Sequence, residues 1–384
     1  MTTSFLSRKP DSGLGNINAR PSHPGRNIDW VLMTAQFVLT IAGGFIVFSA
    51  SRTRVADDPY AFATRQVVFA IVATVVMFVV MAVDYEWWKD RARTLYIFTL
   101  LLLAVLFALG LATGRDMISF DLGPFNMQPA ELAKFTTLLM LAVYLAEEDT
   151  DTVSYPRFLG GLIIVGAPSV LVIIQPDLGS ASVIVSLAMG ILLVAGAKIR
   201  YILLISLLAL TTVAAAFIGN LVDRYQITRI EALINPQGVD SDFTYQAENA
   251  KRAFGTGGIW GKGWLQGPLT NGRDIPVMWA DFPFAAVGEQ FGFAGSVALL
   301  AVIAVALVRI WRIAHLSRDL LGTYICAGVF TMLLWQVFQN VGMTLGIMPV
   351  TGLPLPFISY GGSGLLVYFA LFGLVQSVHM RRMA

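Results

Sequence analysis

The sequence is short of charge for its length. Of 384 residues only 13% are Asp, Glu, Lys or Arg, and 56% are hydrophobic, whereas soluble domains carry about 25% charged residues. So few charges cannot solvate an ordinary globule of this size, which indicates a protein that crosses a membrane several times. The net charge of +2 is too small to favour a nucleic-acid partner.

Cysteine and histidine are also scarce. The single cysteine, Cys326, lies in an apolar run and excludes an intramolecular disulfide, so cysteine usage does not reveal the redox compartment. The three histidines, His23, His315 and His379, are scattered and belong to no Cys/His metal motif or Ser–His–Asp pattern. The sequence therefore gives no sign of a His/Cys metal site or of a serine hydrolase.

Long apolar runs, by contrast, are abundant. A helix needs about 20 apolar residues to cross the hydrocarbon core of a bilayer, because each residue adds about 1.5 Å. From apolar runs of about this length we expect an all-α integral membrane protein, with a polar, disordered tail over 1–29 and one membrane domain over 30–384. The ten expected spans are 31–50, 66–83, 94–112, 131–146, 157–174, 179–197, 201–221, 283–308, 322–346 and 363–379.

The positions of lysine and arginine predict the orientation of these spans, because positive residues gather in cytoplasmic loops. With the N-terminus in the cytoplasm, fifteen of them fall on the cytoplasmic side and four in the short outer loops. Both termini are therefore expected to be cytoplasmic. The irregular segments then face outward: a loop over about 222–282 between the seventh and eighth spans, and the stretches 114–131 and 348–364. A loop this long is usually functional, so we expect the working surface outside.

Two short outer motifs place charges at the start of expected spans. "QPAELAK" (128–134) puts Glu131 and Lys134 three residues apart, on one helix face. They either offset each other as buried charges or line a cavity as a charged pair. "QPDLGSA" (175–181) places Asp177 where it can cap the sixth span, and a role in the site is the alternative.

A third outer motif, "TGLPLPFISYGGSG" (351–364), has prolines that break helices and glycines that permit tight turns. Irregular backbone at membrane depth persists only where it is buried in protein or lines a cavity. The motif is therefore either a re-entrant turn or the wall of a substrate cavity, in which Ser359 and Tyr360 are the candidate contacts.

The long loop contains "NPQGVDSDFTYQAENAKRAFGTGGIWGKGWLQG" (235–267), which mixes glycines, aromatics and the cations Lys251, Arg252 and Lys262. Glycine-rich backbone beside cations suits phosphate, through exposed N–H groups and point charges. The pattern is not that of a P-loop. An ordinary interfacial loop with an amphipathic helix is the alternative.

Two carboxylates stand in "MWADFPFAAVGEQFGFAG" (278–295), at the start of an apolar helix. Pro283 suits a first helical turn, so Asp281 is either a cap near the positive helix end or a functional group. Glu289 follows eight residues later, about 12 Å along the helix and roughly 80° around it. It cannot contact the same small site unless the fold bends toward it.

Together these motifs resemble the RodA/FtsW family of SEDS glycosyltransferases, over residues 28–382. Their order and spacing in a ten-span topology carry the resemblance. The stretches 340–356 and 373–382 are more similar to the elongation branch than to the division branch. The motifs are "FSAS" (48–51), "RQ" (65–66), "QPAELAKF" (128–135), "QPDLGSA" (175–181), "YQAENAKRAFGTGGIWGKGW" (245–264), "DFPFAAVGEQFGFAG" (281–295) and "NVGMTLGIMPVTGLPLPFISYGGSGLL" (340–366).

The resemblance implies that the protein polymerises lipid II, a disaccharide-pentapeptide on undecaprenyl diphosphate, into peptidoglycan. The family's catalytic aspartate lies in a motif written H-T-D-F-I-F-A, which Asp281 matches here. Trp279 and Ala280 replace its His-Thr, and Gln290 replaces the second acid of the family's usual Glu-Glu. The chemistry should therefore need Asp281 itself rather than the residues in front of it.

Glycosyl transfer with inversion needs a base beside the attacking hydroxyl and stabilisation of the leaving group. We expect cations to hold the diphosphate, with a divalent ion (Mg or Mn) as a further aid. The cationic candidates are Lys134 and Lys262 first, then Lys251, Arg252, Arg224 and Arg229.

The family also implies the bacterial inner membrane and a class B penicillin-binding protein as partner. Three alternatives stay open: a lipid II transporter, a scaffold that activates a partner, and a polymerase of the division branch. Polymerisation and flipping assays separate them.

Overall fold

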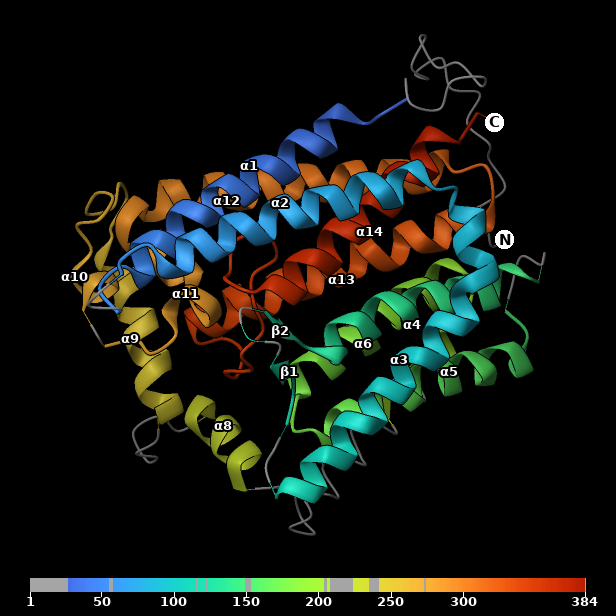
Figure 1. Cartoon of the computed structure of the whole chain (residues 1–384), viewed down its shortest axis with the longest axis horizontal. Helices are drawn as coiled ribbons and strands as arrows, with labels where there is room; N and C mark the ends of the chain where they lie inside the picture. The colour runs from blue at the N-terminus through green and yellow to red at the C-terminus, as the bar shows by residue number, and fades with distance from the viewer. Residues whose placement is uncertain are drawn as a thin grey trace.

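Helices make up most of the computed structural model, and the long ones pack into a bundle (Figure 1). It describes residues 27–54, 58–114, 117–121, 123, 125–148, 153–203, 206–207, 224–234, 242–272 and 274–383. The expected all-α architecture is confirmed. The one sheet in this part of the chain is a two-stranded hairpin.

Nine of the ten expected spans correspond to helices in the described residues. Eight are long and apolar enough to cross a membrane, and α6 is a shorter apolar helix. The seventh expected span, 201–221, lies mostly outside the described residues, so the ten-span count stays a prediction. The nine helices are α1 (Trp30–Ser51), α2 (Ala61–Ala82), α3 (Tyr85–Thr113), α4 (Pro129–Ala146), α5 (Tyr155–Ile174), α6 (Leu178–Val194), α12 (Pro283–Leu316), α13 (Leu320–Leu345) and α14 (Gly362–Met380).

Local sequence explains where several of these helices begin and end. Asp29, Asp84 and Asp319 precede α1, α3 and α13, and each side chain accepts a hydrogen bond from a backbone N–H of the first turn. Such caps satisfy donors that have no partner within the helix. Gly114 and Gly346 follow α3 and α13 with φ of 65° and 73°. This left-handed conformation often ends a helix, and glycine adopts it more easily than other residues.

Burial separates the central helices from the outer ones. Most residues of α4 and α14 are buried, whereas most residues of α2 and α3 are exposed or only half-buried. The exposed faces carry large apolar residues such as Ile71, Phe98 and Leu101. A continuous apolar surface of this kind suits lipid rather than water, so the fold is that of a multi-pass membrane protein.

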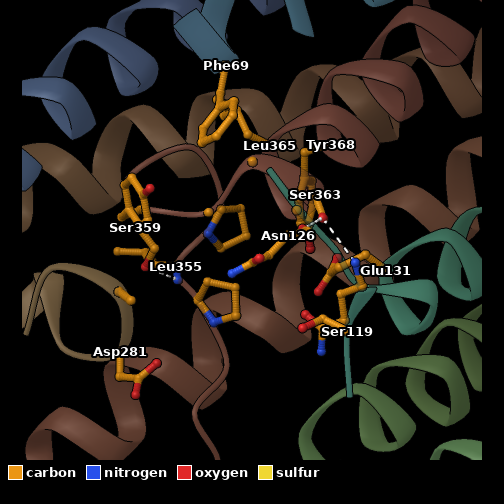
Figure 2. A pocket seen from close by; sticks show the side chains of 18 of the residues that line it. Phe69, Ser119, Asn126, Glu131, Asp281, Leu355, Ser359, Ser363, Leu365 and Tyr368 are labelled. Atoms are coloured by element: carbon orange, nitrogen blue, oxygen red, sulfur yellow. Dashed lines mark hydrogen bonds between the residues drawn. The ribbon is translucent and has the colours of Figure 1, made fainter. Parts of the chain in front are cut away.

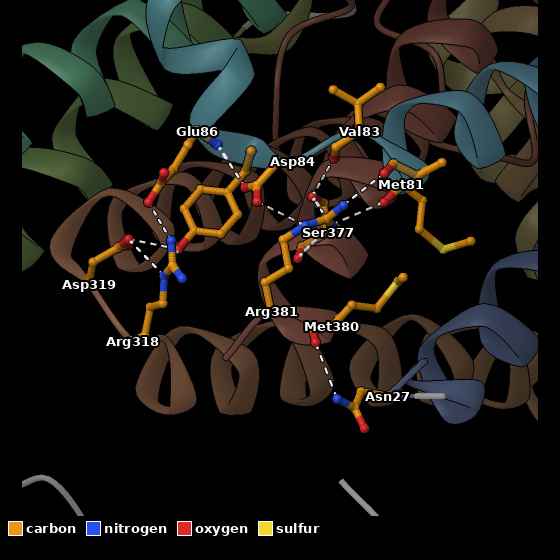
Figure 3. Close-up of polar contacts among 12 residues, drawn as sticks. Asn27, Met81, Val83, Asp84, Glu86, Arg318, Asp319, Ser377, Met380 and Arg381 are labelled. Carbon is orange, nitrogen blue, oxygen red and sulfur yellow. Dashed lines mark hydrogen bonds and ion pairs between the residues drawn. The ribbon is translucent and has the colours of Figure 1, made fainter. Parts of the chain in front are cut away.

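Side chains at one end of the bundle tie several helix ends together (Figure 3). Arg381, just after α14, donates to the carbonyl of Ala82 at 2.7 Å and pairs with Asp84 at 3.1 Å. The Tyr85 hydroxyl donates to Asp319 at 2.6 Å, from the start of α3 to the start of α13. These contacts lock α2, α3, α13 and α14 together at the end opposite the candidate site described below.

The long loop expected over 222–282, just before α12, contributes four short helices to the other end. They are α8 (Arg224–Ile234), α9 (Asp242–Thr256), α10 (Pro268–Asn271) and α11 (Met278–Asp281). Between α3 and α4 lies the antiparallel hairpin of β1 (Phe120–Asp121) and β2 (Asn126–Met127), in which Phe120 pairs with Met127. This end therefore carries the irregular backbone, as the sequence predicts.

Helix α12 breaks at Gly292, whose φ of 68° and ψ of −163° are not helical. The carbonyls of Glu289 and Gln290, on the preceding turn, accept bonds from the N–H groups of Lys262 and Gly263 at 2.9 and 3.0 Å. A Cβ on Gly292 would lie 2.3 Å from a backbone nitrogen of the same loop. The glycine-rich loop thus docks into the break, and the break needs glycine because L side chains rarely adopt this conformation.

This docking changes the interpretation of the glycine-rich loop. The N–H groups of Gly261, Lys262 and Gly263 are all engaged by backbone carbonyls. The sequence suggested that these N–H groups are exposed donors for phosphate, and the structure shows that they are not. The glycines instead permit close backbone contact: a Cβ on Gly257 or Gly261 would lie about 2 Å from a carbonyl oxygen of α12.

Candidate active site

A cavity of about 480 Å³ opens among α4, α11, the hairpin and the segment that connects α13 to α14 (Figure 2). Its polar lining includes two carboxylates, Asp281 and Glu131, which come from different elements. Its walls also contain much of the Pro- and Gly-rich segment 352–364. The motif connects α13 to α14 and forms a cavity wall, and that this cavity takes a substrate stays a prediction. We call this space the Asp281 cavity.

The backbone around Asp281 is held on two sides. The Asn340 side-chain N–H₂ group on α13 donates to the Asp281 carbonyl at 2.9 Å and to the Leu353 carbonyl at 2.7 Å. The Tyr360 N–H donates to the Trp279 carbonyl at 2.9 Å. Helix α11 is therefore fixed between α13 and the cavity wall, which sets the position from which the Asp281 side chain enters the cavity.

Asp281 is not a helix cap in this arrangement. The N-cap residue of α12 is Phe282, which is followed by Pro283 in the first turn. Within the described part of the chain, no hydrogen bond reaches the Asp281 carboxylate, which is only partly buried and lines the cavity. The carboxylate is therefore left to interact with whatever enters the cavity.

Burial of the Asp281 carboxyl raises its pKa to about 6, and the nearby Arg229 guanidinium lowers the pKa in part. Burial acts in this direction because it disfavours the charged form. A carboxylate with a pKa near 6 is ionised at neutral pH yet basic enough to take a proton from a hydroxyl during a reaction. This is the property expected of a general base.

Trp279, which stands where the family motif has histidine, anchors α11. Its ring packs against Phe62 with centroids 4.9 Å apart, and the Arg54 guanidinium lies 5.8 Å from the ring centroid. A large aromatic side chain with a cation over its face is a stable contact. The departure from the motif therefore serves to hold α11 rather than to supply a titrating group.

The predicted pair on α4 is confirmed. Lys134 Nζ lies 2.6 Å from Glu131 Oε1, and both residues are buried. The other carboxylate oxygen of Glu131 has no hydrogen-bond partner among the described residues, and Glu131 lines the cavity while Lys134 does not. The pair thus offsets two buried charges and still presents one carboxylate oxygen toward the cavity.

Ser359 and Tyr360, predicted as substrate contacts, both line the cavity. The Ser359 hydroxyl accepts a bond from the Leu355 N–H at 2.7 Å, and the Tyr360 ring meets Phe62 edge-on with centroids 5.1 Å apart. Both residues therefore shape the wall as well as face the space inside it.

Asp177 is the cap that the sequence predicted. Its carboxylate accepts from the Ser180 N–H at 2.9 Å and from the Gln128 side chain at 2.9 Å. It is not among the described residues that line the cavity. Asp177 therefore holds the start of α6 against the start of α4.

Lys262 and Glu289 lie together beneath the long loop, 3.8 Å apart. Glu289 is fully buried and accepts bonds from the backbone N–H groups of Leu269 and Thr270 at 3.0 and 2.7 Å. Gln290 accepts a further bond from the Ser49 hydroxyl at 2.6 Å. Neither Glu289 nor Gln290 lines the Asp281 cavity in the described residues, so both fasten the loop to α12.

Lys251 and Arg252 lie in a second cavity, of about 450 Å³, together with Arg229. It is formed by α8, α9 and residues 346–350. The other predicted cation on α8 is Arg224, whose side chain the structure does not describe. The cations predicted to bind the diphosphate therefore lie in different places: Lys251 and Arg252 line the second cavity, and Lys262 pairs with Glu289.

Arg65 lines the Asp281 cavity and was not predicted as a site residue. It is the one cation among the described residues of the lining. The sequence offered a signal, since Arg65 stands in the "RQ" motif. Deeper in the cavity, the Tyr368 hydroxyl donates to Gln336 at 2.7 Å. That pair joins α13 to α14, and neither residue was predicted because the contact arises only in the packed bundle.

The chain matches the family model described as a cell cycle protein of the FtsW, RodA and SpoVE type, over residues 29–384. It is 32% identical to stage V sporulation protein E of Bacillus subtilis, over 91% of this chain and 96% of that protein. It is also 32% identical to peptidoglycan glycosyltransferase MrdB of Escherichia coli, over 93% and 94% of the two chains.

Two solved structures are similar along nearly the whole chain. One belongs to a peptidoglycan synthase complex that coordinates polymerization and crosslinking; it is 29% identical, with a TM-score of 0.76, over 93% of this chain and 98% of that one. The other is the rod shape determining protein RodA of Thermus thermophilus, 29% identical with a TM-score of 0.69, over 93% and 98%.

Proposed function

Because the chain belongs to the FtsW, RodA and SpoVE family and is a peptidoglycan glycosyltransferase, we propose that it polymerises lipid II with Asp281 as its general base. One observation carries the proposal. The Asp281 carboxylate enters the cavity from a clamped backbone, and none of the described residues donates a hydrogen bond to it. The raised pKa of its carboxyl fits the same role.

In the proposed step, the Asp281 carboxylate takes the proton of the acceptor sugar's 4-hydroxyl as that oxygen bonds to the anomeric carbon of the donor. The bond from the anomeric carbon to the diphosphate breaks at the same time, and its electron pair leaves with the diphosphate. Direct displacement of this kind inverts the anomeric centre. The fixed backbone around Asp281 supplies the orientation that such a step requires.

Lys251 and Arg252 lie in the second cavity, and the other predicted site residues fall into two groups. Glu131, Ser359 and Tyr360 line the cavity, so we propose that they contact the sugar or peptide of lipid II. The remaining residues have charged side chains that are already held by protein partners, and we assign them positioning roles; they are Lys134, Lys262 and Asp177.

A divalent ion remains part of the proposal, although the described residues do not hold it by themselves. No group of three or more His, Cys, Asp or Glu side chains with metal-site spacing occurs among them. Magnesium is commonly bound by one or two carboxylates together with substrate phosphates. A Mg²⁺ or Mn²⁺ ion would therefore bind only when the diphosphate supplies oxygens.

The placement of the site supports the proposed topology, in which both termini are cytoplasmic and the cavity faces outward in the bacterial inner membrane. Lipid-linked donor and acceptor would reach it from the outer leaflet. The similarity to a chain of a synthase complex that coordinates polymerization and crosslinking supports a class B penicillin-binding protein as the partner of this chain. Which branch of the family it serves, elongation or division, stays a prediction in favour of elongation.

A polymerisation assay tests the proposal. Purified Asp281→Asn protein, supplied with lipid II and the partner, should form glycan strands about a hundredfold to ten-thousandfold more slowly than wild type, which is the usual contribution of a general base. Asp58→Asn is the matched control, because Asp58 is exposed and absent from the described lining. Wild-type rates in Asp281→Asn would refute the role of Asp281. Movement of labelled lipid II across liposomes without any polymer would favour the transporter instead.

A further inference from the structure

The second cavity is built differently from the first. Its described lining holds three cations and one carboxylate, which are Arg229, Lys251, Arg252 and Glu248. The Asp281 cavity has the opposite balance, with two carboxylates and one arginine among its described lining residues. Lys134 offsets Glu131 at 2.6 Å, so the first cavity is close to neutral, whereas the second has an excess of positive charge that attracts a ligand group with several negative charges. We call the second space the cationic cavity.

The cations of this cavity are not neutralised by their neighbour on α9. Glu248 precedes Lys251 by three residues and Arg252 by four, a spacing that suits helical ion pairs. No ion pair within 4.0 Å forms between them in this part of the structure, and all three side chains are exposed. The two positive charges therefore remain accessible to a ligand.

Apolar residues complete the wall beside these charges. Leu233 on α8 and Met348, Pro349 and Val350 after α13 line the same space. The Arg229 guanidinium lies over the Phe243 ring, 5.0 Å from its centroid, which fixes its position. A cavity with cations on one side and apolar groups on the other fits an amphipathic anion, such as a phosphorylated lipid.

A single segment of chain separates the two cavities. Residues 348–350 line the cationic cavity, and 352 together with 354–357 line the Asp281 cavity. Arg229 also acts electrostatically on the Asp281 carboxyl. The two spaces are therefore neighbours across the 348–357 segment.

We propose that the cationic cavity binds the diphosphate of the lipid-linked donor, while the Asp281 cavity holds the sugars. This rests on the proposed function and adds a separate place for the leaving group. As the anomeric carbon–oxygen bond breaks, the diphosphate gains negative charge, and the cations of the cavity stabilise it. The polyprenyl diphosphate product then stays bound there until it dissociates.

A binding experiment on protein that cannot turn over tests this. Asp281→Asn protein in nanodiscs of neutral phosphatidylcholine is titrated with radiolabelled undecaprenyl diphosphate. We expect the added double change Lys251→Gln/Arg252→Gln to weaken binding at least tenfold. The matched change Glu248→Gln should instead tighten binding, because it removes the one carboxylate of the described lining. Thermal unfolding of each variant reports whether it is folded.

Three outcomes would overturn the proposal. The first is equal binding by the double variant and its parent. The second is a loss of binding in Arg65→Gln instead, which would place the diphosphate in the Asp281 cavity. The third is displacement of the label by phosphatidylglycerol at equal concentration, which would make the cavity a general site for anionic headgroups. Failure of the base assignment would show separately, as polymerisation that does not need Asp281, and would leave these binding results intact.

Discussion

Replacing Asp281 with Asn should abolish activity and at the same time stabilise the fold. The pKa of the Asp281 carboxyl is about 6 in the folded protein and 3.8 without burial. The folded state therefore holds its proton more tightly, and stability falls as pH rises from about 4 to 6. Each pKa unit corresponds to about 1.4 kcal/mol, so the ionised Asp281 carboxylate lowers the free energy of unfolding by at most about 3 kcal/mol. Partial exposure of Asp281 reduces this to about 1 to 2 kcal/mol.

Thermal unfolding in detergent, followed from pH 3.5 to pH 8, measures the effect. The unfolding temperatures of wild type and Asp281→Asn should coincide at pH 3.5 and separate above pH 6, with the Asn variant more stable. Asp58→Asn should follow wild type throughout. A constant difference at all pH values would show that Asn acts through packing rather than charge, and a less stable Asn variant would refute the argument from burial.

Three further changes test other parts of the structure. In pH–rate measurements, kcat/KM should fall about tenfold from pH 7 to pH 5 as Asp281 is protonated. Arg229→Gln should move this fall in kcat/KM to higher pH, because Arg229 lowers the pKa of Asp281. In unfolding measurements, Lys134→Met should cost about 3–5 kcal/mol by leaving Glu131 unpaired, and adding Glu131→Gln should recover most of this loss. In an expression assay, Gly292→Ala should reduce the yield of folded protein, because the strained backbone and the clash together cost more than about 2 kcal/mol. Gly44→Ala is the control: nothing lies within 4 Å of its added Cβ, so the yield should not change.

Features set by local sequence were predicted well. The apolar runs located nine of the described helices, because the length of a span depends only on the thickness of the bilayer. The spacing of Glu131 and Lys134 predicted their ion pair, and the position of Asp177 predicted its cap, since both contacts arise within one turn of helix. Spacing alone favoured a cap at Asp281, whereas the N-cap of α12 is Phe282, and it was the resemblance that indicated a functional role for Asp281.

Features that depend on packing between distant segments were missed. The glycine-rich loop looked like a phosphate site because its sequence does not show that α12 breaks at Gly292 and takes up the loop's N–H groups. Arg65 carried a signal in its motif, but only the packed bundle brings it to the same cavity as Asp281. The division of the cations between two cavities depends on the course of the 348–357 segment, which no local pattern specifies.

The separation of charges between the two cavities gives a physical reason for building the site from so many elements. A carboxylate that acts as a base must be partly buried, yet the leaving diphosphate needs cations close by. Placed directly beside Asp281, those cations would lower its pKa and weaken it as a base. The 348–357 segment keeps Lys251 and Arg252 in a separate cavity, and the cation that lowers the Asp281 pKa is Arg229. A bound diphosphate would offset Arg229 and so raise the basicity of Asp281 when the donor is in place.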